Sequence, residues 1–258
     1  MLEKNYKFLL WIYIFWFLGS VLLTSLHILG PELTSIHSLF LIFAGIFAAV
    51  FFIMQYGKGL GLAITILIFV VTLCIEWMQL SYTGNAASES FEMVLNGMPI
   101  TFAFIWIGLI AGTHIIAREI TLKINIDWIR GGIYAIIGAT MIMFFEILID
   151  PILLQAKRLF LMNLGFTDIQ VSDLVNWWTL GLILHLMIYF ILSLTNRWEN
   201  LKYPDLKSEI ITVYWIIIVF FVFLSSFGGL WFSIAITLFA NLLFTSGYYL
   251  SLAKNRKK

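Results

Sequence analysis

Four ionisable side chains lie within or at the ends of long apolar stretches of this sequence: Glu76, Glu146, Asp150 and His185. An ionisable group inside a membrane span is costly, and such groups usually mark a functional site. Glu146 and Asp150 are four residues apart, so a helix would place both on one face. Two carboxyl groups on one apolar face repel each other when both are ionised, and burial further disfavours the charged form. We therefore expect one protonated acid beside one carboxylate, a pair suited to general acid–base catalysis.

Each of these residues also has a structural interpretation. A glutamate near the end of a span, such as Glu76, can extend to the membrane surface. His185 lies in the middle of its apolar stretch and could orient a carboxylate, shuttle a proton or form a hydrogen bond between helices. His114 is interpreted as interfacial, and His27 and His37 as solvated, because they lie near the ends of apolar stretches.

Motifs for metals, nucleotides and nucleic acids are missing from the sequence. There is no aspartate-rich Mg²⁺-diphosphate motif, no glycine-rich phosphate loop and no dinucleotide fingerprint. Cys74 is the only cysteine, which excludes a cysteine-based metal cluster within one chain. The formal net charge of +1 gives no basic patch for nucleic acid. Glu146, Asp150 and His185 could in principle hold a divalent cation, but we expect no metal, no cofactor and no nucleic-acid partner.

The composition is that of an integral membrane protein. Hydrophobic residues make up 62% of the chain and charged residues 11%, against roughly 45–50% and about 25% in soluble domains. A soluble domain could not bury so much apolar surface, so the excess must face lipid. A helix of about 20 apolar residues spans a bilayer. Such stretches occur at residues 8–29, 38–56, 59–79, 99–117, 129–149, 174–194, 210–227 and 230–252.

These stretches predict an all-α, polytopic transmembrane bundle with about eight spans, built as a single integral membrane domain of residues 1–258. The last two stretches are separated only by Ser225-Ser226-Phe227-Gly228-Gly229, and seven spans would result if they were continuous. The first stretch follows Lys4 and Lys7, as a signal peptide would. Its apolar run is longer than the 7–15 residues typical of a signal peptide, so we expect an uncleaved anchor.

The distribution of basic residues predicts the orientation in the membrane. With eight spans and the N-terminus in the cytoplasm, 13 of the 15 Lys and Arg residues lie on the inner side. Inner loops are enriched in Lys and Arg, so we expect a cell-membrane protein with both termini in the cytoplasm.

The acidic residues show the opposite bias, because eight of the 14 fall at or near the predicted outer side. Glu76, Glu146 and Asp150 all lie near outer span ends. Facing lipid would cost each of them roughly 2.5–3.5 kcal/mol at mid-depth, so we expect the three to converge in one outer pocket. Trp77, Trp106 and Trp177 lie near these acids in sequence or in predicted depth, where their rings could stabilise a cation, although packing and interfacial anchoring are the alternatives.

Three motifs between residues 70 and 195 occur in an order that resembles the integral membrane carotenoid biosynthesis proteins, which include carotenoid 1′,2′-hydratases. The first motif is Glu76, Thr83-Gly84, Gly97-Met98-Pro99 and Trp106. The second is Glu146-Ile147-Leu148-Ile149-Asp150-Pro151, whose proline we expect to end the helix or to start a re-entrant segment. The third is Asp173-Leu174-Val175-Asn176-Trp177, followed by His185.

This resemblance implies a hydratase-like enzyme, a hydro-lyase that adds water to a terminal double bond of a polyene dissolved in the membrane lipid. Glu76, Glu146, Asp150 and His185 would be the catalytic residues, with His185 orienting the acids. Trp77, Trp106, Asp173 and Trp177 would bind the substrate, and no metal would be needed. Two alternatives stay open: a transporter or proton-coupled carrier that uses the same ionisable residues as a relay, and a non-catalytic scaffold of the pathway.

Overall fold

The computed structural model describes residues 2–28, 35–83, 94–95, 98–157 and 171–255. Helices form almost all of this part of the chain, because the long apolar stretches satisfy their backbone hydrogen bonds internally. Two two-residue strands, β1 (Val94–Leu95) and β2 (Met98–Pro99), pair antiparallel. The helices are α1 (Leu2–Ser25), α2 (Ser35–Tyr56), α3 (Lys58–Thr83), α4 (Ile100–Thr121), α5 (Asp127–Lys157), α6 (Val171–Leu194), the short 3-10 helix η3 (Pro204–Leu206), α7 (Lys207–Phe227) and α8 (Trp231–Asn255).

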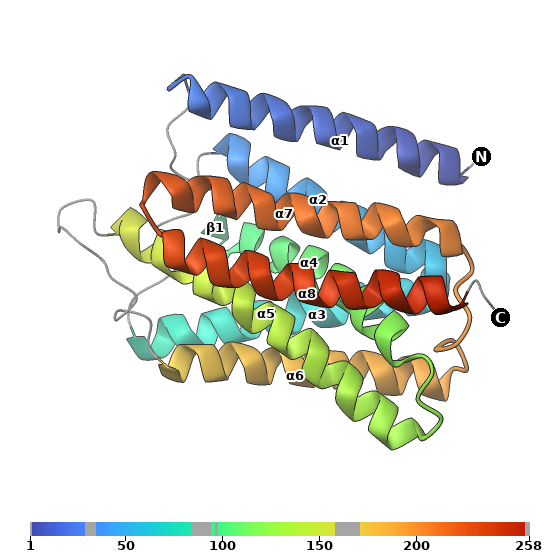
Figure 1. The fold of residues 1–258 in the computed structure, drawn as a ribbon. Coiled ribbons are helices and arrows are strands. Elements are labelled where there is room, and N and C mark those ends of the chain that lie inside the picture. Colours follow the sequence, from blue (N-terminus) through green and yellow to red (C-terminus); the bar gives the residue numbers. More distant parts are fainter. Residues whose placement is uncertain (1, 29–34, 84–93, 96–97, 158–170, 256–258) are drawn as a thin grey trace.

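The described residues contain eight helices that are long and apolar enough to cross a membrane, which confirms the predicted all-α transmembrane class. The break between the last two spans is also confirmed: α7 ends at Phe227, and Gly229 adopts a positive φ of 70° before α8 begins. Glycine reaches this conformation without steric cost. Both chain termini lie at the same end of the bundle (Figure 1), here named the terminal end, and the other end is named the far end.

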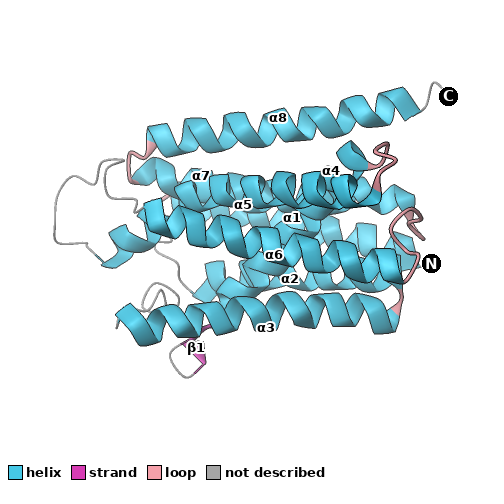
Figure 2. Cartoon of the chain, turned by 90° about the horizontal axis from the view of Figure 1, so that it is seen from below, coloured by secondary structure: helices cyan, strands magenta, loops and turns pink. Residues whose placement is uncertain are grey.

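Helix α4 is the central element of the bundle. It packs against α2, α3, α5, α7 and α8, and 89% of its membrane-spanning window is buried, against 22% for α1. Figure 2 shows α3 and α8 on opposite sides of the bundle. Polar side chains carried by α4 are therefore shielded from lipid by its neighbours.

One expectation about the backbone is wrong. Pro151 neither ends a helix nor starts a re-entrant segment, because α5 continues through it to Lys157. A proline removes one backbone hydrogen bond from a helix, and neighbouring groups in a membrane bundle can compensate for that loss. The preference of the residue before proline for extended conformations is a bias that the surrounding helices override here.

Glycines allow two large polar side chains to lie against neighbouring helices. A Cβ atom at Gly138 of α5 would clash with the His185 ring of α6, and one at Gly112 of α4 would clash with the Tyr214 ring of α7. Small residues at such contacts are typical of helix packing in membranes. The positions of the His185 and Tyr214 rings against neighbouring helices depend on these two glycines.

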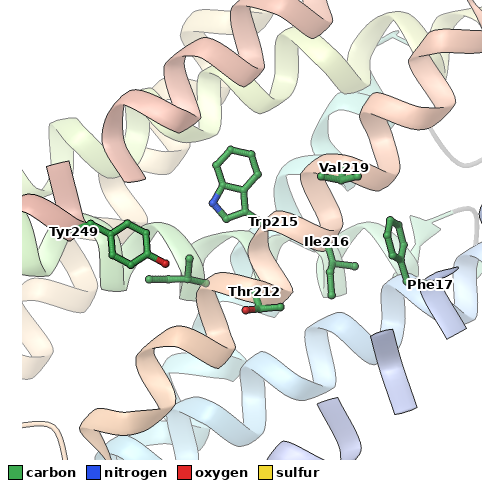
Figure 3. Close-up of a pocket in the computed structure, with 7 residues that line it drawn as sticks. Phe17, Thr212, Trp215, Ile216, Val219 and Tyr249 are labelled. Carbon is green, nitrogen blue, oxygen red and sulfur yellow. The ribbon is translucent and has the colours of Figure 1, made fainter. Parts of the chain in front are cut away.

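A groove of about 230 Å³ lies on the surface between α1, α7 and α8 (Figure 3). Seven mostly apolar residues line it: Phe17, Ile211, Thr212, Trp215, Ile216, Val219 and Tyr249. None of the predicted catalytic or substrate-binding residues belongs to this set, so this groove is not the predicted site.

Candidate functional site

Glu146 is buried between helices near the far end of α5, with 1% of its surface exposed. It lies on the same stripe of α5 as Ala139 and Ile142, since these positions are separated by three and four residues. Gly181 of α6 packs against both Ala139 and Ile142. Because α5 and α6 run in opposite directions (Figure 1), Glu146 faces α6 about one turn closer to the far end than Gly181.

An aromatic cluster lies at this same level of the bundle. The rings of Trp106 on α4 and Trp177 on α6 are 5.2 Å apart, and Phe102 of α4 lies 5.5 Å from Trp177. Trp177 precedes Gly181 by one helical turn and is on the same face of α6, so it also faces α5 near Glu146. Both tryptophans are buried. The Trp106 indole N–H is a buried donor without a hydrogen-bond partner among the described residues.

Glu76 is also buried at the far end, but it approaches α4 from a different helix. Phe69 of α3 contacts Phe104 of α4, with ring centroids 5.5 Å apart. Glu76 lies two turns further along the same face of α3. This position is beside the start of α4, where α3 also contacts β2. Glu76 is 6% exposed and therefore buried, so the alternative interpretation, in which it extends to the membrane surface, is wrong.

Three further predicted site residues belong to the far end: Asp150, Asp173 and Trp77. Asp150 follows Glu146 by one turn in the continuous helix α5, as expected, and Asp173 lies in the first turn of α6. The side chains of both fall outside the described residues, so the convergence of Glu76, Glu146 and Asp150 in one pocket stays a prediction. Trp77 is 56% exposed on α3 and is more accessible than Trp106 and Trp177.

His185 is fully buried in the middle of α6, and both of its ring nitrogens have partners. Nδ1 lies 2.7 Å from the Gly181 carbonyl oxygen, and Nε2 lies 3.0 Å from the Thr113 hydroxyl of α4. A carbonyl only accepts, so Nδ1 carries the proton, and a neutral ring then accepts at Nε2 from Thr113. The ring packs on Gly138, which is about 12 Å along α5 from Glu146 at 1.5 Å per residue.

We expect His185→Gln to reduce the alkene hydration that the sequence resemblance implies by less than the loss of a carboxyl group does. The glutamine amide oxygen can still accept from Thr113, so the contact between α4 and α6 survives in part. Turnover per folded protein is the measurement. A loss as large as that of Glu146→Gln would instead assign the imidazole a proton-transfer role.

A second histidine network was missed by the sequence interpretation. His114 is not interfacial, because it is fully buried on α4. Its Nε2 lies 2.7 Å from the Tyr56 hydroxyl of α2, and its Nδ1 lies 2.6 Å from the Tyr134 hydroxyl of α5. The Tyr134 ring also contacts His185, with centroids 5.3 Å apart. Tertiary packing brings these residues together from three helices, and no local sequence motif indicates it.

The terminal end of α4 carries a buried ion cluster. Arg118 is 2% exposed and bonds Glu119 Oε1 at 2.6 Å, while Lys207 of α7 approaches the same oxygen at 2.8 Å. The Arg118 guanidinium also donates to the carbonyl oxygens of Trp198 and Glu199, each at 2.8 Å. Arginine suits this position because its five donors are fixed in a planar fork.

The same cluster holds the α6–α7 connection against the bundle. Trp198 is buried and packs edge-on against Tyr134 and Tyr189, with centroids 4.8 Å and 4.6 Å away. Gln55 of α2 donates to the Tyr203 carbonyl at 2.7 Å and accepts from its N–H at 2.9 Å. Residues 195–206 therefore cover the terminal ends of α2, α4 and α5.

The two remaining histidines, His27 and His37, differ in exposure, and potential metal ligands do not cluster among the described residues. Within the described ranges, no group of three His, Cys, Asp or Glu residues could hold a metal ion. His27 is exposed, as expected, whereas the expectation that His37 is solvated is wrong. His37 is fully buried near the start of α2, and its ring contacts Phe220 of α7.

Eight apolar helices around a buried set of carboxyl, imidazole and aromatic side chains define a multi-pass membrane protein with polar chemistry inside its bundle. The sequence from residue 36 to residue 244 matches the family of carotenoid biosynthesis proteins, and the chain belongs to that family. This match confirms the resemblance inferred from the three motifs. No curated protein and no solved structure matches the chain significantly.

Proposed function

We propose that this carotenoid biosynthesis protein is a hydratase that adds water to a terminal double bond of a carotenoid or related isoprenoid. The observation that carries the proposal is Glu146, a buried carboxyl group at the level of the Trp106–Trp177 ring pair, whose centroids are 5.2 Å apart. A long polyene already resides in the bilayer, so a site within the helices can receive it directly from lipid.

The chemistry needs one acid and one base. A carboxylic acid transfers its proton to one carbon of the double bond, which leaves a tertiary carbocation on the other. The faces of Trp106 and Trp177 stabilise this cation. Water then adds through its oxygen, and a second carboxylate takes the released proton, so the product is a tertiary alcohol. Proton exchange between the two carboxyl groups restores the starting state. We assign these roles to Glu146 and Asp150, with Glu76 supporting them.

The Trp106 indole supplies a hydrogen-bond donor for this reaction. Its buried N–H has no partner among the described residues, and an unsatisfied buried donor is unfavourable. The oxygen of the attacking water, or the hydroxyl oxygen of the product, would satisfy it. His185 acts at a distance, because its contact with Thr113 holds α6 against α4 and thereby fixes the position of Trp177.

The main alternative is a proton-coupled carrier, which requires a water path from the acids to both faces of the membrane. The cover formed by residues 195–206, anchored by Arg118, Gln55 and the buried Trp198, favours the enzyme. A lipid-soluble substrate needs no path through the terminal end. A scaffold without activity would need no buried acid.

The test of the function is the pigment profile of cells with and without the gene. Chromatography and mass spectrometry should detect a carotenoid heavier by one water only when the protein is present. An unchanged pigment profile together with a lost ion or solute flux would identify the carrier. An unchanged profile without any lost flux would identify the scaffold.

We further propose that the protein resides in the cell membrane with its terminal end in the cytoplasm, since the sequence assigns 13 of its 15 basic residues to segments on that side. A cysteine introduced at exposed Lys123, in the α4–α5 connection, should react with a membrane-impermeant thiol reagent only after the cells are opened. Cys74 should first be replaced by serine, because it is exposed on the bundle surface. Labelling of position 123 in intact cells would reverse the orientation.

A further inference from the structure

The groove between α1, α7 and α8 is separate from the far-end acids and opens toward the lipid (Figure 3). Val219 and Tyr249 on its walls are 40% and 56% exposed, although both belong to membrane-spanning helices. Its volume of about 230 Å³ holds roughly eight small groups of about 30 Å³ each, the volume of a water molecule. A single turn of helix, about 10 Å across and about 5.4 Å long, already fills more than this volume. The groove therefore fits one slender chain from the membrane and not the helix of another protein.

Two polar groups on the groove wall have no hydrogen-bond partner in the described part of the chain: the Trp215 indole N–H and the Tyr249 hydroxyl. Trp215 lies near the middle of its span, Pro204–Phe227. The aromatic belts at the two membrane surfaces therefore do not explain its position. A polar group without a partner is costly at this depth, because lipid tails offer no hydrogen bond. An oxygen atom of a ligand in the groove would satisfy both groups.

The two groups converge because α7 and α8 run in opposite directions (Figure 1). Side chains in helices are directed toward the helix N-terminus, so Trp215 of α7 is directed toward the terminal end and Tyr249 of α8 toward the far end. In Figure 3 the indole nitrogen and the Tyr249 hydroxyl lie on the sides of the two rings that face each other. Thr212 lines the groove one turn closer to the terminal end than Trp215. Its hydroxyl donates to the Ser208 carbonyl at 2.9 Å, and its oxygen can still accept.

The charges around the groove favour a neutral ligand. Its lining contains no Lys, Arg, His, Asp or Glu. At the terminal end of the same helices, Lys7 of α1 pairs with Glu209 of α7 at 3.2 Å, and Glu209 also accepts from Ser208 at 2.9 Å. These two charges are directed at each other, so they leave little attraction for an anionic lipid headgroup. From Trp215 toward the far end the lining is apolar, with Val219 on α7 and Phe17 on α1.

We propose that this groove, here named the alcohol groove, binds the hydroxyl end of a linear polyene that carries a tertiary alcohol. The ligand oxygen accepts from the Trp215 N–H and the Tyr249 hydroxyl, and its own proton is donated to the Thr212 oxygen. A ketone or ester oxygen only accepts and cannot form the third bond. The polyene continues along the apolar wall toward the far end.

The alcohol groove lies on different helices from Trp106 of α4 and Trp177 of α6, so its ligand is held outside the reaction site. The product of the hydration proposed above is such a tertiary alcohol, and a polyene is the class of molecule that the family handles. We therefore assign the groove to the product, a role that rests on the proposed hydratase function. The recognition of a polyene alcohol does not rest on it.

Circular dichroism of the full chain in phosphatidylcholine nanodiscs tests the binding, because an achiral polyene gives a visible band only when a chiral site holds it. The probe is a linear carotenoid with one tertiary hydroxyl end, supplied in purified form. Val219→Trp fills the groove, and Val50→Trp is the matched control, since Val50 of α2 is 39% exposed and does not line the groove. We expect one saturable component of the band to be present in the control and lost in Val219→Trp. Equal bands in the two variants would overturn the proposal.

Tyr249→Phe and Trp215→Phe test the recognition of the hydroxyl, because each removes one hydrogen-bond donor and keeps an aromatic ring. Each should weaken binding of the alcohol by about 2–10-fold, the value of one hydrogen bond, and leave binding of the matching hydroxyl-free carotenoid unchanged. Trp16→Phe is the control, since Trp16 is a partly exposed tryptophan of α1 that contacts Phe43 and does not line the groove. Equal losses for both carotenoids would mean a site for any hydrocarbon chain and would overturn the proposal.

Two further outcomes separate this proposal from its alternatives. Self-association that is lost in Val219→Trp while alcohol binding stays unchanged would make the groove an interface between copies of the chain, and would overturn the proposal. Groove binding of the supplied alcohol without any hydrated pigment in cells retains the alcohol groove and rejects the hydratase. Hydrated pigment without groove binding retains the hydratase and rejects the alcohol groove.

Discussion

Replacing Glu146 with glutamine should lower the rate of carotenoid hydration by about 10²–10⁴-fold, the usual contribution of a general acid or base. The amide keeps the size and much of the hydrogen-bonding capacity of the carboxyl group but does not titrate. Glu146 is buried near the Trp106–Trp177 pair, where a proton donor would reach a bound polyene. The measurement is product formed from a ψ-end carotenoid in membranes, normalised to the amount of folded protein.

Asp150→Asn should give a loss of the same order, because the two carboxyl groups share the acid and base roles. Asp205→Asn is the matched control, since Asp205 is an exposed carboxylate in the α6–α7 connection at the terminal end. It should leave turnover unchanged. Full activity in Glu146→Gln would remove that residue from the chemistry, and full activity in Asp150→Asn would do the same for Asp150.

The same substitutions separate the enzyme from the carrier. In a hydratase they abolish a pigment product and leave ion fluxes alone. In a carrier they leave the pigments alone and abolish a flux, because an ionisable relay residue is lost.

The fold could be predicted from the sequence because spans are defined by local composition. Each of the eight apolar stretches lies in a helix, and the helix ends differ from the predicted ends by at most eight residues. Polar residues at the ends of these stretches were harder to place. The fourth stretch was expected to end at residue 117, yet α4 continues to Thr121 with Arg118 and Glu119 buried. Hydropathy treats such residues as exposed, whereas their pairing with each other and with Lys207 allows their burial.

The candidate site could be predicted only in part for a related reason. The spacing of Glu146 and Asp150 specifies a shared helix face, and the structure places both on one continuous helix. The contact between the Trp106 and Trp177 rings and the bonding of His114 to Tyr56 and Tyr134 depend on which helices are neighbours. Helix pairing leaves no local signal in a single sequence, so these contacts became visible only in the folded chain.

A large effect on the stability of the protein is expected from the ion cluster at the terminal end. Arg118→Met should destabilise the protein by about 3–5 kcal/mol, the cost of breaking a buried ion pair by removing one partner. Methionine keeps part of the aliphatic volume but removes the donors to Glu119 and to the carbonyls of Trp198 and Glu199. Those acceptors then stay buried with fewer partners, and the α6–α7 connection loses its main anchor.

Chemical unfolding in detergent measures the change in free energy, and limited proteolysis should show faster cleavage within residues 195–206. The double variant Arg118→Met/Glu119→Gln should recover part of the lost stability, because the buried carboxylate no longer lacks its arginine, and Lys207 is partly exposed to solvent. Lys202→Met serves as the control, since Lys202 is an exposed cation in the same connection that lies over the Tyr203 ring. Its effect should stay within about 1 kcal/mol, as expected for an exposed cation–π contact. An Arg118→Met variant as stable as this control would mean that Lys207 alone is a sufficient partner for buried Glu119, and that Arg118 does not hold the terminal end closed.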